Sequence, residues 1–241
     1  DRVKPFPSDI AIRTIQDELK VPLEDAFATF NPESLAAASI GQVHDATLKK
    51  GEKVVIKVQR PKIEQLMHTD IDIMYYFAKL LQAHYPEVSK FINPIDIVKE
   101  FERYTEAELN YMLEAKHIEH FYRNFQNHPN IKIPKPYLNL STRRIVVMEK
   151  IEGIPILDIR RDPKYDKRLI NNILTDSIMK QVFIDGYFHA DPHPGNIFVL
   201  GKDRIAFLDF GIVGIIDEKL KENITKLFIG MIQGNLDIMA E

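Results

Sequence analysis

The stretch "HADPHPGN", residues 189–196, places two histidines, an aspartate, two prolines, a glycine and an asparagine within eight residues. Asp191 and Asn196 are five residues apart, and Asp209 lies thirteen residues beyond Asn196, as the first residue of "DFG". Carboxylate and amide oxygens are the ligands that a hard cation such as Mg²⁺ prefers. The order of these three residues predicts a loop that takes part in phosphate transfer.

Protein kinases use the same parts in the same order. An aspartate accepts the proton of the substrate hydroxyl, an asparagine five residues later binds magnesium, and the aspartate of a following Asp-Phe-Gly also binds magnesium. We therefore expect Asp191 to be catalytic, and Asn196 and Asp209 to hold the metal. Two other interpretations stay open: His189 and His193 could belong to a zinc or iron site, or His189 could be a structural histidine in a polar turn.

Phosphates also need a cation, and Lys57 in "VVIKVQRP", residues 54–61, is the candidate. Apolar residues flank it, as they flank the strand lysine of kinases. An edge-strand lysine that points to water is the alternative. Because an unpaired buried charge is costly, a buried Lys57 needs a carboxylate partner, for which we choose Glu114. The rivals that periodicity leaves open are Glu106, Glu108 and Glu119.

A loop over the phosphates would come from "AAASIGQVH", residues 36–44, which precedes the predicted hairpin that carries the lysine. Kinases use several glycines here, whereas this stretch has only Gly41. Ser39, Gln42 and backbone amides could supply donors; a strand of small residues is the alternative. Farther along, the adenine would pair with the backbone around Glu149 to Ile151, beside Met148, unless this is an ordinary exposed strand end.

The chain of 241 residues is 45% hydrophobic and 28% charged, which suits one domain or two closely packed lobes. A net charge of −3 gives no electrostatic case for nucleic acid. The absence of cysteine excludes disulfides, thiol catalysis and cysteine metal sites. No apolar run approaches the roughly 20 residues that span a bilayer.

The order of elements predicts a β-rich first half decorated with helices, a connector, and a helical second half with a small hairpin. The first helix would follow Ser8 or Asp9 as N-cap, and Pro61 would be the first residue of another helix. The expected elements are a hairpin over 35–59, helices over 63–81 and 95–125, a strand over 143–153, a helix over 167–186, a hairpin over 196–211 and a helix over 217–232.

Taken together, "AAASIGQVH", "VVIKVQRP", "ELNYMLEA" and "FHADPHPGN" with "LDFG" resemble the UbiB family of atypical kinase-like proteins, also called the ADCK family. The resemblance covers nearly the whole chain from Phe6. It implies an α+β, protein-kinase-like two-lobed fold, with a β-rich N-lobe that carries extra helices and a truncated helical C-lobe. The expected domains are 1–152 and 153–241.

The resemblance also implies ATP (or ADP) and Mg²⁺ as cofactors and the ion pair Lys57–Glu114. It makes an alanine-rich nucleotide loop of Ala36, Ala37, Ala38, Ser39, Ile40 and Gly41. Two features depart from the family. Its Lys-x-Gly-Gln motif does not occur here, and its Glu-x-Asp motif reads Glu108-Leu109-Asn110, so that Asn110 lacks the charge of the family's aspartate.

The expected function is an ATPase or unorthodox kinase that supports isoprenoid quinone biosynthesis or lipid homeostasis. The resemblance implies partners among membrane lipids, quinone precursors or quinone-biosynthesis proteins. It also implies peripheral attachment to a membrane, on the cytoplasmic or organelle matrix side. Two alternatives remain: a small-molecule phosphotransferase of the aminoglycoside or choline kinase kind, and a nucleotide-binding pseudokinase scaffold.

Overall fold

The computed structural model describes residues 3–85, 87 and 92–233. The chain forms two compact units. The first comprises Asp1–Glu119 and Lys135–Lys150, and the second comprises His120–Pro134 and Ile151–Glu241. The second unit thus includes residues 120–134, which lie before the domain boundary predicted between residues 152 and 153. The division into domains 1–152 and 153–241 stays a prediction.

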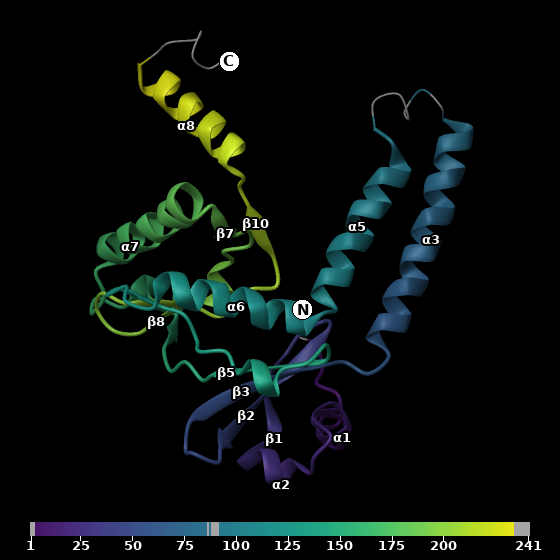
Figure 1. Cartoon of the computed structure of the whole chain (residues 1–241), viewed down its shortest axis with the longest axis vertical. Coiled ribbons are helices and arrows are strands. Elements are labelled where there is room, and N and C mark those ends of the chain that lie inside the picture. The colour runs from purple at the N-terminus through teal and green to yellow at the C-terminus, as the bar shows by residue number, and fades with distance from the viewer. Residues whose placement is uncertain (1–2, 86, 88–91, 234–241) are drawn as a thin grey trace. The chain divides into compact units, whose positions relative to one another are not determined.

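The first unit is built on a four-stranded antiparallel sheet in the order β1-β2-β3-β5 (Figure 1). Its strands are β1 (Phe27–Ala37), β2 (Gly41–Leu48), β3 (Lys53–Gln59) and β5 (Ile145–Glu149). The turn between β2 and β3 uses Gly51 at φ 92°, a left-handed conformation that glycine adopts without steric cost. The predicted hairpin is confirmed.

One face of this sheet forms the apolar core of the first unit. Successive strand residues point to opposite faces, so Val54, Ile56 and Val58 of β3 lie together, all with no exposed surface. Helix α1 (Ser8–Leu19) adds Ala11 and Ile15 to the same core cluster. The short helix α2 (Leu23–Ala26) and the 3₁₀ turn η1 (Leu138–Leu140) complete this side.

Helix α1 begins differently from the prediction. Its N-cap is Pro7, no side chain caps it, and Ser8 and Asp9 are already helical. The expected cap by Ser8 or Asp9 was therefore wrong, and Asp9 instead places an acidic group in the first turn, where it favours the helix dipole.

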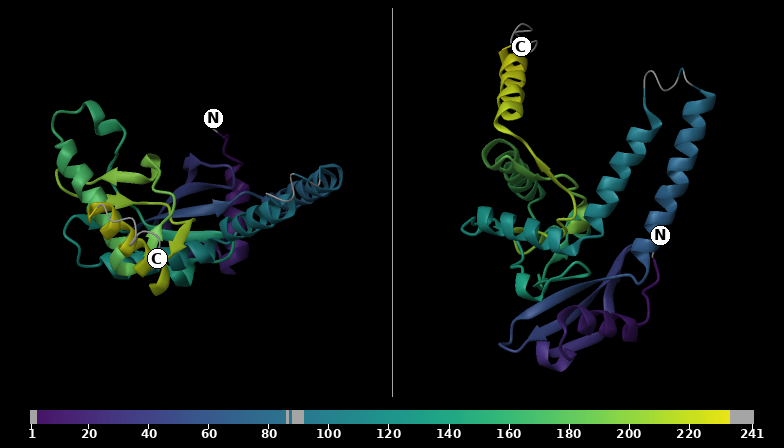
Figure 2. Two further views of the ribbon diagram at one scale, coloured as in Figure 1. Left: turned by 90° about the horizontal axis from the view of Figure 1, so that it is seen from above. Right: turned by 45° about the vertical axis from the view of Figure 1, so that its right-hand side comes forward.

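Helices α3 (Ile63–His84) and α5 (Pro94–Glu108) lie side by side as a helical hairpin, which Figures 1 and 2 show from three directions. Ile71 and Ala78 of α3 pack against Val98 of α5. Pro61 is not the first residue of α3, because the helix begins at Ile63 after Lys62 in a left-handed conformation.

The predicted helix over 95–125 is two helices. Helix α5 ends at Glu108, and α6 (Tyr111–Phe125) follows after Leu109 and Asn110. The break has a clear cause, since Gln59 of β3 donates its side-chain N–H to the carbonyl of Leu109 at 2.9 Å. The carbonyl of Arg143 accepts the N–H of Tyr111 at 2.9 Å. Bonds from outside the helix therefore take the groups that a continuous helix would use.

The second unit contains a four-stranded sheet in the order β4-β9-β8-β6 and a two-stranded sheet, β10-β7. These strands are β4 (Ile131–Lys132), β6 (Ile154–Pro155), β7 (Tyr187–His189), β8 (Ile197–Val199), β9 (Ile205–Phe207) and β10 (Val213–Ile215). Its helical segments are η2 (Asp158–Arg161), α7 (Lys167–Met179), η3 (Lys180–Asp185), η4 (Pro194–Asn196) and α8 (Glu218–Gln233).

The predicted helix over 167–186 is α-helical only to Met179. Asp166 caps it by accepting the N–H groups of Arg168 and Leu169 at 2.9 and 3.1 Å. The chain then makes a π-helical turn, η3, and stops at Gly186 with φ 62°. Among the described residues, no helix is both long enough and apolar enough to cross a membrane.

Candidate functional site

Lys57 lies on the face of β3 opposite the core, and its partner is Glu114 of α6. The Lys57 Nζ is 3.0 and 2.9 Å from the two carboxylate oxygens of Glu114. The two side chains are only 14% and 5% exposed. Nζ also lies 5.0 Å from the centre of the Tyr111 ring. Lys57 thus forms a largely buried ion pair with both oxygens of the carboxylate that was chosen from the sequence.

The alanine-rich segment is part strand and part loop. Ala36 and Ala37 belong to β1 and pair with Val43 and Gln42 of β2. Ala38, Ser39 and Ile40 form the loop, which is closed by a bond of 2.8 Å from the N–H of Ala38 to the carbonyl of Gly41.

Gly41 is required by space rather than by its backbone angle. A Cβ atom at this position would lie 2.4 Å from the Tyr111 hydroxyl oxygen and 2.6 Å from the carbonyl oxygen of Val58. Any larger residue would push β2 away from β3 just where the loop begins. The glycine of this loop therefore permits close packing beside Lys57.

Gln42 has a different role from the phosphate donor expected of it. It is 1% exposed, and its amide accepts the N–H of Phe6 at 2.8 Å and donates to the carbonyl of Phe6 at 3.2 Å. The second amide hydrogen faces Nε2 of His44 at 2.9 Å. Because both hydrogens are used, Gln42 fixes the N-terminal segment to the sheet and has no donor left for a ligand.

His44 completes this buried network. Its Nε2 accepts from Gln42, so its Nδ1 carries the hydrogen and donates to the carbonyl of Asn31 at 3.0 Å. Burial lowers the pKa of His44, and the bond to Asn31 opposes that shift. The network needs the neutral imidazole, because a second ring proton would face the Gln42 donor.

The residues predicted to hold adenine lie at the end of β5. Met148 is 7% exposed and pairs with Val55 of β3. Glu149 is fixed by Lys135, since the N–H of Glu149 donates to the Lys135 carbonyl at 2.8 Å and its carboxylate accepts the Lys135 N–H at 3.0 Å. Ile151 follows as a half-buried residue of the second unit.

Glu108 and Asn110 flank the break between α5 and α6. Glu108 is the exposed last residue of α5. The carbonyl of Asn110 accepts the N–H groups of Leu113 and Glu114 at 2.9 and 3.4 Å, which starts α6. The neutral residue thus stands at the first turn of the helix that carries Glu114.

In the second unit, the stretch 189–196 follows β7, and His189 anchors it. His189 is 7% exposed, its N–H donates to the Gln181 side chain at 2.9 Å, and its Nδ1 accepts the N–H of Asp191 at 3.2 Å. Its ring lies among those of Phe121, Phe207 and Phe210. The histidine therefore fixes the backbone of the candidate catalytic aspartate.

Burial lowers the pKa of His189, although the backbone and carboxylate of Asp209 and the carboxylate of Asp191 favour its charged form. Since Nδ1 accepts a hydrogen bond, the neutral ring carries its hydrogen on Nε2. This nitrogen is buried and has no partner of normal hydrogen-bond geometry among the described residues. His193, in contrast, is exposed, and its Nδ1 accepts the N–H of Gly195 at 3.1 Å.

Asn196 and Asp209 meet at one end of the hairpin β8–β9. Asn196 immediately precedes β8, and Asp209 follows β9 by one residue, Leu208. The N–H of Leu208 donates to the carbonyl of Asn196 at 2.9 Å, which continues the ladder between the two strands. Oδ1 of Asp209 accepts the N–H of Gly211 at 3.0 Å. Both side chains are half-buried, and both offer oxygen atoms.

The pairing of β7 with β10 places Asp191 near the residues that follow Asp209. These strands pair His189 with Val213, and the N–H of Ala190 donates to the carbonyl of Ile212 at 3.1 Å. Asp191 is exposed. Within the described residues, no three histidine, aspartate or glutamate side chains cluster in an arrangement that could hold a metal ion.

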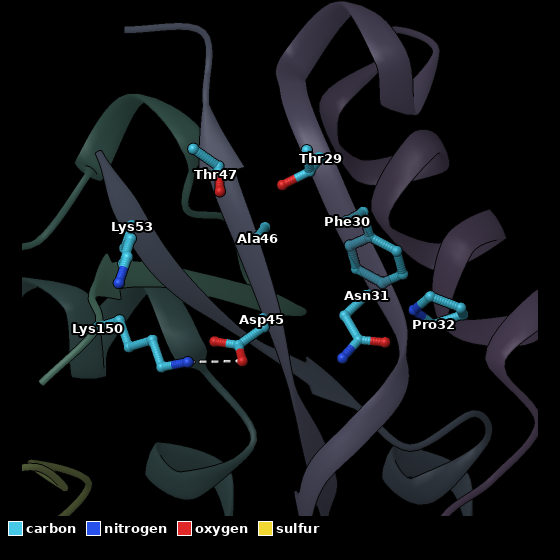
Figure 3. Close-up of a pocket in the computed structure, with 9 residues that line it drawn as sticks. All are labelled: Thr29, Phe30, Asn31, Pro32, Asp45, Ala46, Thr47, Lys53 and Lys150. Atoms are coloured by element: carbon cyan, nitrogen blue, oxygen red, sulfur yellow. Dashed lines mark hydrogen bonds and ion pairs between the residues drawn. The ribbon is translucent and has the colours of Figure 1, made fainter. Parts of the chain in front are cut away.

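Among the pockets formed by the described residues of the first unit, two of the larger ones contain none of the predicted site residues. One, of about 470 Å³, lies where β1 bulges away from β2 opposite Asp45 (Figure 3). Asp45 Oδ2 accepts from Lys150 at 2.7 Å, and its buried Oδ1 has no hydrogen-bond partner among the described residues. The other, of about 580 Å³, is an apolar groove between α3 and α5.

A sheet lysine paired with a helix glutamate, together with an aspartate–asparagine loop before Asp-Phe-Gly, defines a protein-kinase-like domain. A family model described as the ABC1 atypical kinase-like domain matches residues 1–241. The chain therefore belongs to the ABC1 atypical kinase-like family, and the resemblance to UbiB proteins is confirmed.

Curated relatives agree with this membership. A probable protein kinase UbiB of Marinobacter nauticus is 40% identical over 223 residues, which cover 89% of this chain and 40% of the relative. The chloroplastic protein Activity of BC1 complex kinase 1 of Arabidopsis thaliana is 40% identical over 226 residues, covering 92% of this chain and 33% of that protein. The chain thus spans less than half the length of these relatives.

A solved structure supports the fold. The complex of Rv3197 with erythromycin, from Mycobacterium tuberculosis, matches 98% of this chain and 59% of that one, with a TM-score of 0.84 and 28% identity. The predicted α+β, protein-kinase-like fold is confirmed. A small-molecule phosphotransferase of the aminoglycoside or choline kinase kind is not favoured by these matches.

Proposed function

We propose that the chain is the MgATP-binding domain of a UbiB-type enzyme that hydrolyses ATP or transfers its terminal phosphoryl group. In this proposal, Lys57 and Glu114 orient the phosphates. Asp191 is the catalytic carboxylate, and Asn196 and Asp209 hold magnesium. The alanine-rich loop of residues 36–41 covers the phosphates, and the backbone from Glu149 to Ile151 pairs with the adenine beside Met148.

The observation that carries the proposal is the buried ion pair between Lys57 and Glu114. Desolvation of two charges offsets most of their attraction, so such a pair contributes little to stability compared with apolar side chains of similar volume. Its two contacts of 3.0 and 2.9 Å hold an ammonium group in one place on the sheet. A fixed cation of this kind is what a bound polyphosphate requires.

The chemistry of the second unit fits a hard cation. Asn196 and Asp209 present amide and carboxylate oxygens from the same end of one hairpin. Oxygen ligands of this kind suit magnesium, and the chain has no cysteine that would favour a softer metal. Magnesium, when bound, would neutralise negative charge on the phosphates.

Asp191 would accept the proton of the attacking hydroxyl or water at its carboxylate. Its exposure allows access, and the bond from its N–H to Nδ1 of His189 fixes its backbone at 3.2 Å. Because that bond needs an unprotonated Nδ1, the lowered pKa of His189 keeps this support intact near neutral pH.

The biological role that we propose is support of isoprenoid quinone biosynthesis or lipid homeostasis at a membrane surface, on the cytoplasmic or organelle matrix side. The UbiB names of several relatives and the chloroplastic relative support this role. Membrane lipids, quinone precursors and quinone-biosynthesis proteins are the partners proposed.

Calorimetric titration of ATP and ADP, each with and without magnesium, tests the site directly. The wild-type chain should bind both nucleotides, and removal of magnesium should weaken binding. Asp209→Asn should cost about a hundredfold in affinity when magnesium is present, because a metal ligand loses its charge. Asp203→Asn is the matched control: it makes the same change in the β8–β9 turn, at the other end of the hairpin, and should bind as the wild type does.

Equal affinity of the Asp209→Asn variant and the wild type in magnesium would remove Asp209 from the metal site. A chain that binds nucleotide without hydrolysing it, and whose Asp191→Asn variant behaves in the same way, would favour a nucleotide-binding scaffold over an enzyme. An absence of binding to the wild-type chain would contradict the proposal for these 241 residues.

A further inference from the structure

Arg60, which directly follows β3, is bonded to the alanine-rich loop at three successive residues. Its Nε donates to the carbonyl of Ser39 at 3.1 Å, and its Nη2 donates to that of Ala38 at 3.4 Å. Its backbone N–H donates to the carbonyl of Ile40 at 2.7 Å. One residue therefore holds every carbonyl of the loop between β1 and β2.

The direction of these carbonyls fixes the direction of the amides. In a planar trans peptide, the N–H points opposite to the carbonyl of the same peptide unit. When the carbonyls of Ala38 and Ser39 turn toward the guanidinium of Arg60, the N–H groups of Ser39 and Ile40 turn away from it. Successive amides that point in one direction attract anions.

The guanidinium of Arg60 lies on the core side of the sheet, which decides the direction in which the loop amides point. The Arg60 guanidinium is 5.4 Å from the centre of the Phe6 ring, and Phe6 packs in the core with Val58. Lys57, by strand alternation, points to the opposite face. The amides turned away from Arg60 therefore face the side on which the ammonium of Lys57 lies.

The loop has little else to hold it. Ala38 and Ser39 are exposed, and their side chains are too small to pack extensively. Arg60 is itself fixed, because its Nη2 also donates to the carbonyl of Lys4 at 3.0 Å. Gln42 bonds to both the N–H and the carbonyl of Phe6, two residues after Lys4. The planar guanidinium, with five donors in a rigid fork, suits a residue that must bind several carbonyls at once.

We propose that Arg60 is a positioning residue that holds the alanine-rich loop with its amides toward the phosphates of the nucleotide. Glycine-rich loops reach such a geometry through their backbone freedom, whereas this loop reaches it through a side chain. The inference rests on the proposed nucleotide site, and it assigns a phosphate-directed role to a residue that does not itself touch the nucleotide.

The test compares ATP, ADP and adenosine as ligands of the wild type, Arg60→Lys and Arg60→Gln. Loss of the clamp should lower affinity for ATP about tenfold, lower affinity for ADP by less, and leave adenosine within about twofold, since adenosine has no phosphate. Arg60→Lys should behave like Arg60→Gln, because lysine keeps the charge but lacks the fork. The control is Arg143→Lys, whose guanidinium pairs with Glu64 at 2.8 Å on the surface, and it should match the wild type.

Amide hydrogen exchange separates positioning from general destabilisation. In both Arg60 variants, the amides of Ala38 and residue 60, which bond to the carbonyls of Gly41 and Ile40, should exchange faster while those of β5 keep their protection. An equal loss for ATP and adenosine, or a normal Arg60→Lys variant beside a weak Arg60→Gln variant, would overturn the inference and leave the nucleotide site standing. A wild-type chain that binds none of the three ligands would instead refute the proposed function, and the inference with it.

Discussion

The loop of residues 36–41 in the first unit and the loop of residues 189–196 in the second are held by different kinds of contact. In the first, Gln42 bonds to Phe6, 36 residues away, and Arg60 bonds to Lys4, 56 residues away. In the second, the N–H groups of Asp191 and Gly195 reach side chains only two residues away.

The two regions therefore keep their shape in different ways. The loop of residues 189–196 draws part of its support from side chains within its own motif, while Gln181 and the carbonyl of Ile212 anchor its beginning from outside. The loop of residues 36–41 depends on β3, on the N-terminal segment and on α6. We therefore expect substitutions around the first loop to cost more stability than substitutions of local contacts in the second unit.

The largest effect should follow Lys57→Met, which leaves the buried Glu114 carboxylate without its ammonium partner. Breaking a buried ion pair from one side typically costs about 3 kcal/mol or more. Chemical denaturation should show this loss, and nucleotide binding should fail. The matched control is Lys53→Met, four residues earlier on the same face of β3, which should leave both properties unchanged.

The double variant Lys57→Met with Glu114→Leu sharpens this prediction. Removal of both charges should recover most of the lost stability, because apolar side chains can replace a buried pair at little cost. Nucleotide binding should stay lost. Recovery of binding in the double variant would contradict a role for the ion pair in orienting phosphates.

Gly41→Ala should be next in size. The new Cβ would meet the Tyr111 hydroxyl oxygen at 2.4 Å and the Val58 carbonyl oxygen at 2.6 Å. Overpacking of this kind costs about 2 kcal/mol, measured by chemical denaturation. Adding Tyr111→Phe should recover only part of the loss, since the backbone contact with Val58 persists. A fully stable Gly41→Ala variant would mean that β2 and β3 separate more easily than the structure indicates.

Removal of a local contact in the second unit should cost less. Asp166→Ala deletes the cap of α7, in which one oxygen accepts the N–H groups of Arg168 and Leu169, and should lower the free energy of unfolding by about 1 kcal/mol. Ser8→Ala is its counterpart in the first unit, where no side chain caps α1, and should change stability little. A larger loss for Ser8→Ala than for Asp166→Ala in chemical denaturation would contradict the assignment of the caps.

The most gradual effect should come from pH. The pKa of His44 in the folded chain lies below the value of 6.5 for an exposed histidine. As the pH falls through 6.5, the unfolded chain takes up a proton that the folded chain resists, so the free energy of unfolding decreases; above this range the contribution is complete. Thermal unfolding between pH 8 and 5.5 should show a smaller decrease for His44→Gln than for the wild type. His68→Gln, on the exposed side of α3, should retain the wild-type dependence.

Much of the fold follows from local patterns in the sequence. The β2–β3 hairpin is predicted by "KKGEK" between apolar runs, and the β8–β9 hairpin by "GKD" between "NIFVL" and "RIAFLDFG". The single helix expected over 95–125 failed for a long-range reason. The side chain of Gln59 and the carbonyl of Arg143 take up backbone groups at Leu109 and Tyr111, and no local pattern records those bonds.

The same division applies to the candidate site. The order of Lys57, Asp191, Asn196 and Asp209 can be read from the sequence because each lies in a compact motif. Arg60 is also in a motif, "VVIKVQRP", but its target carbonyls lie about twenty residues earlier and belong to backbone groups that have no sequence signature. Contacts from a side chain to distant backbone carbonyls therefore cannot be predicted from the sequence and are seen only in the structure.

Amide hydrogen exchange with and without saturating MgADP tests the proposed nucleotide binding most directly. We expect slower exchange in two segments together, residues 36–41 of the first unit and residues 189–211 of the second. Asp209→Asn should abolish protection in both, although the substitution lies only in the second unit. Protection confined to one unit, or protection of the first unit that survives Asp209→Asn, would contradict the proposed function.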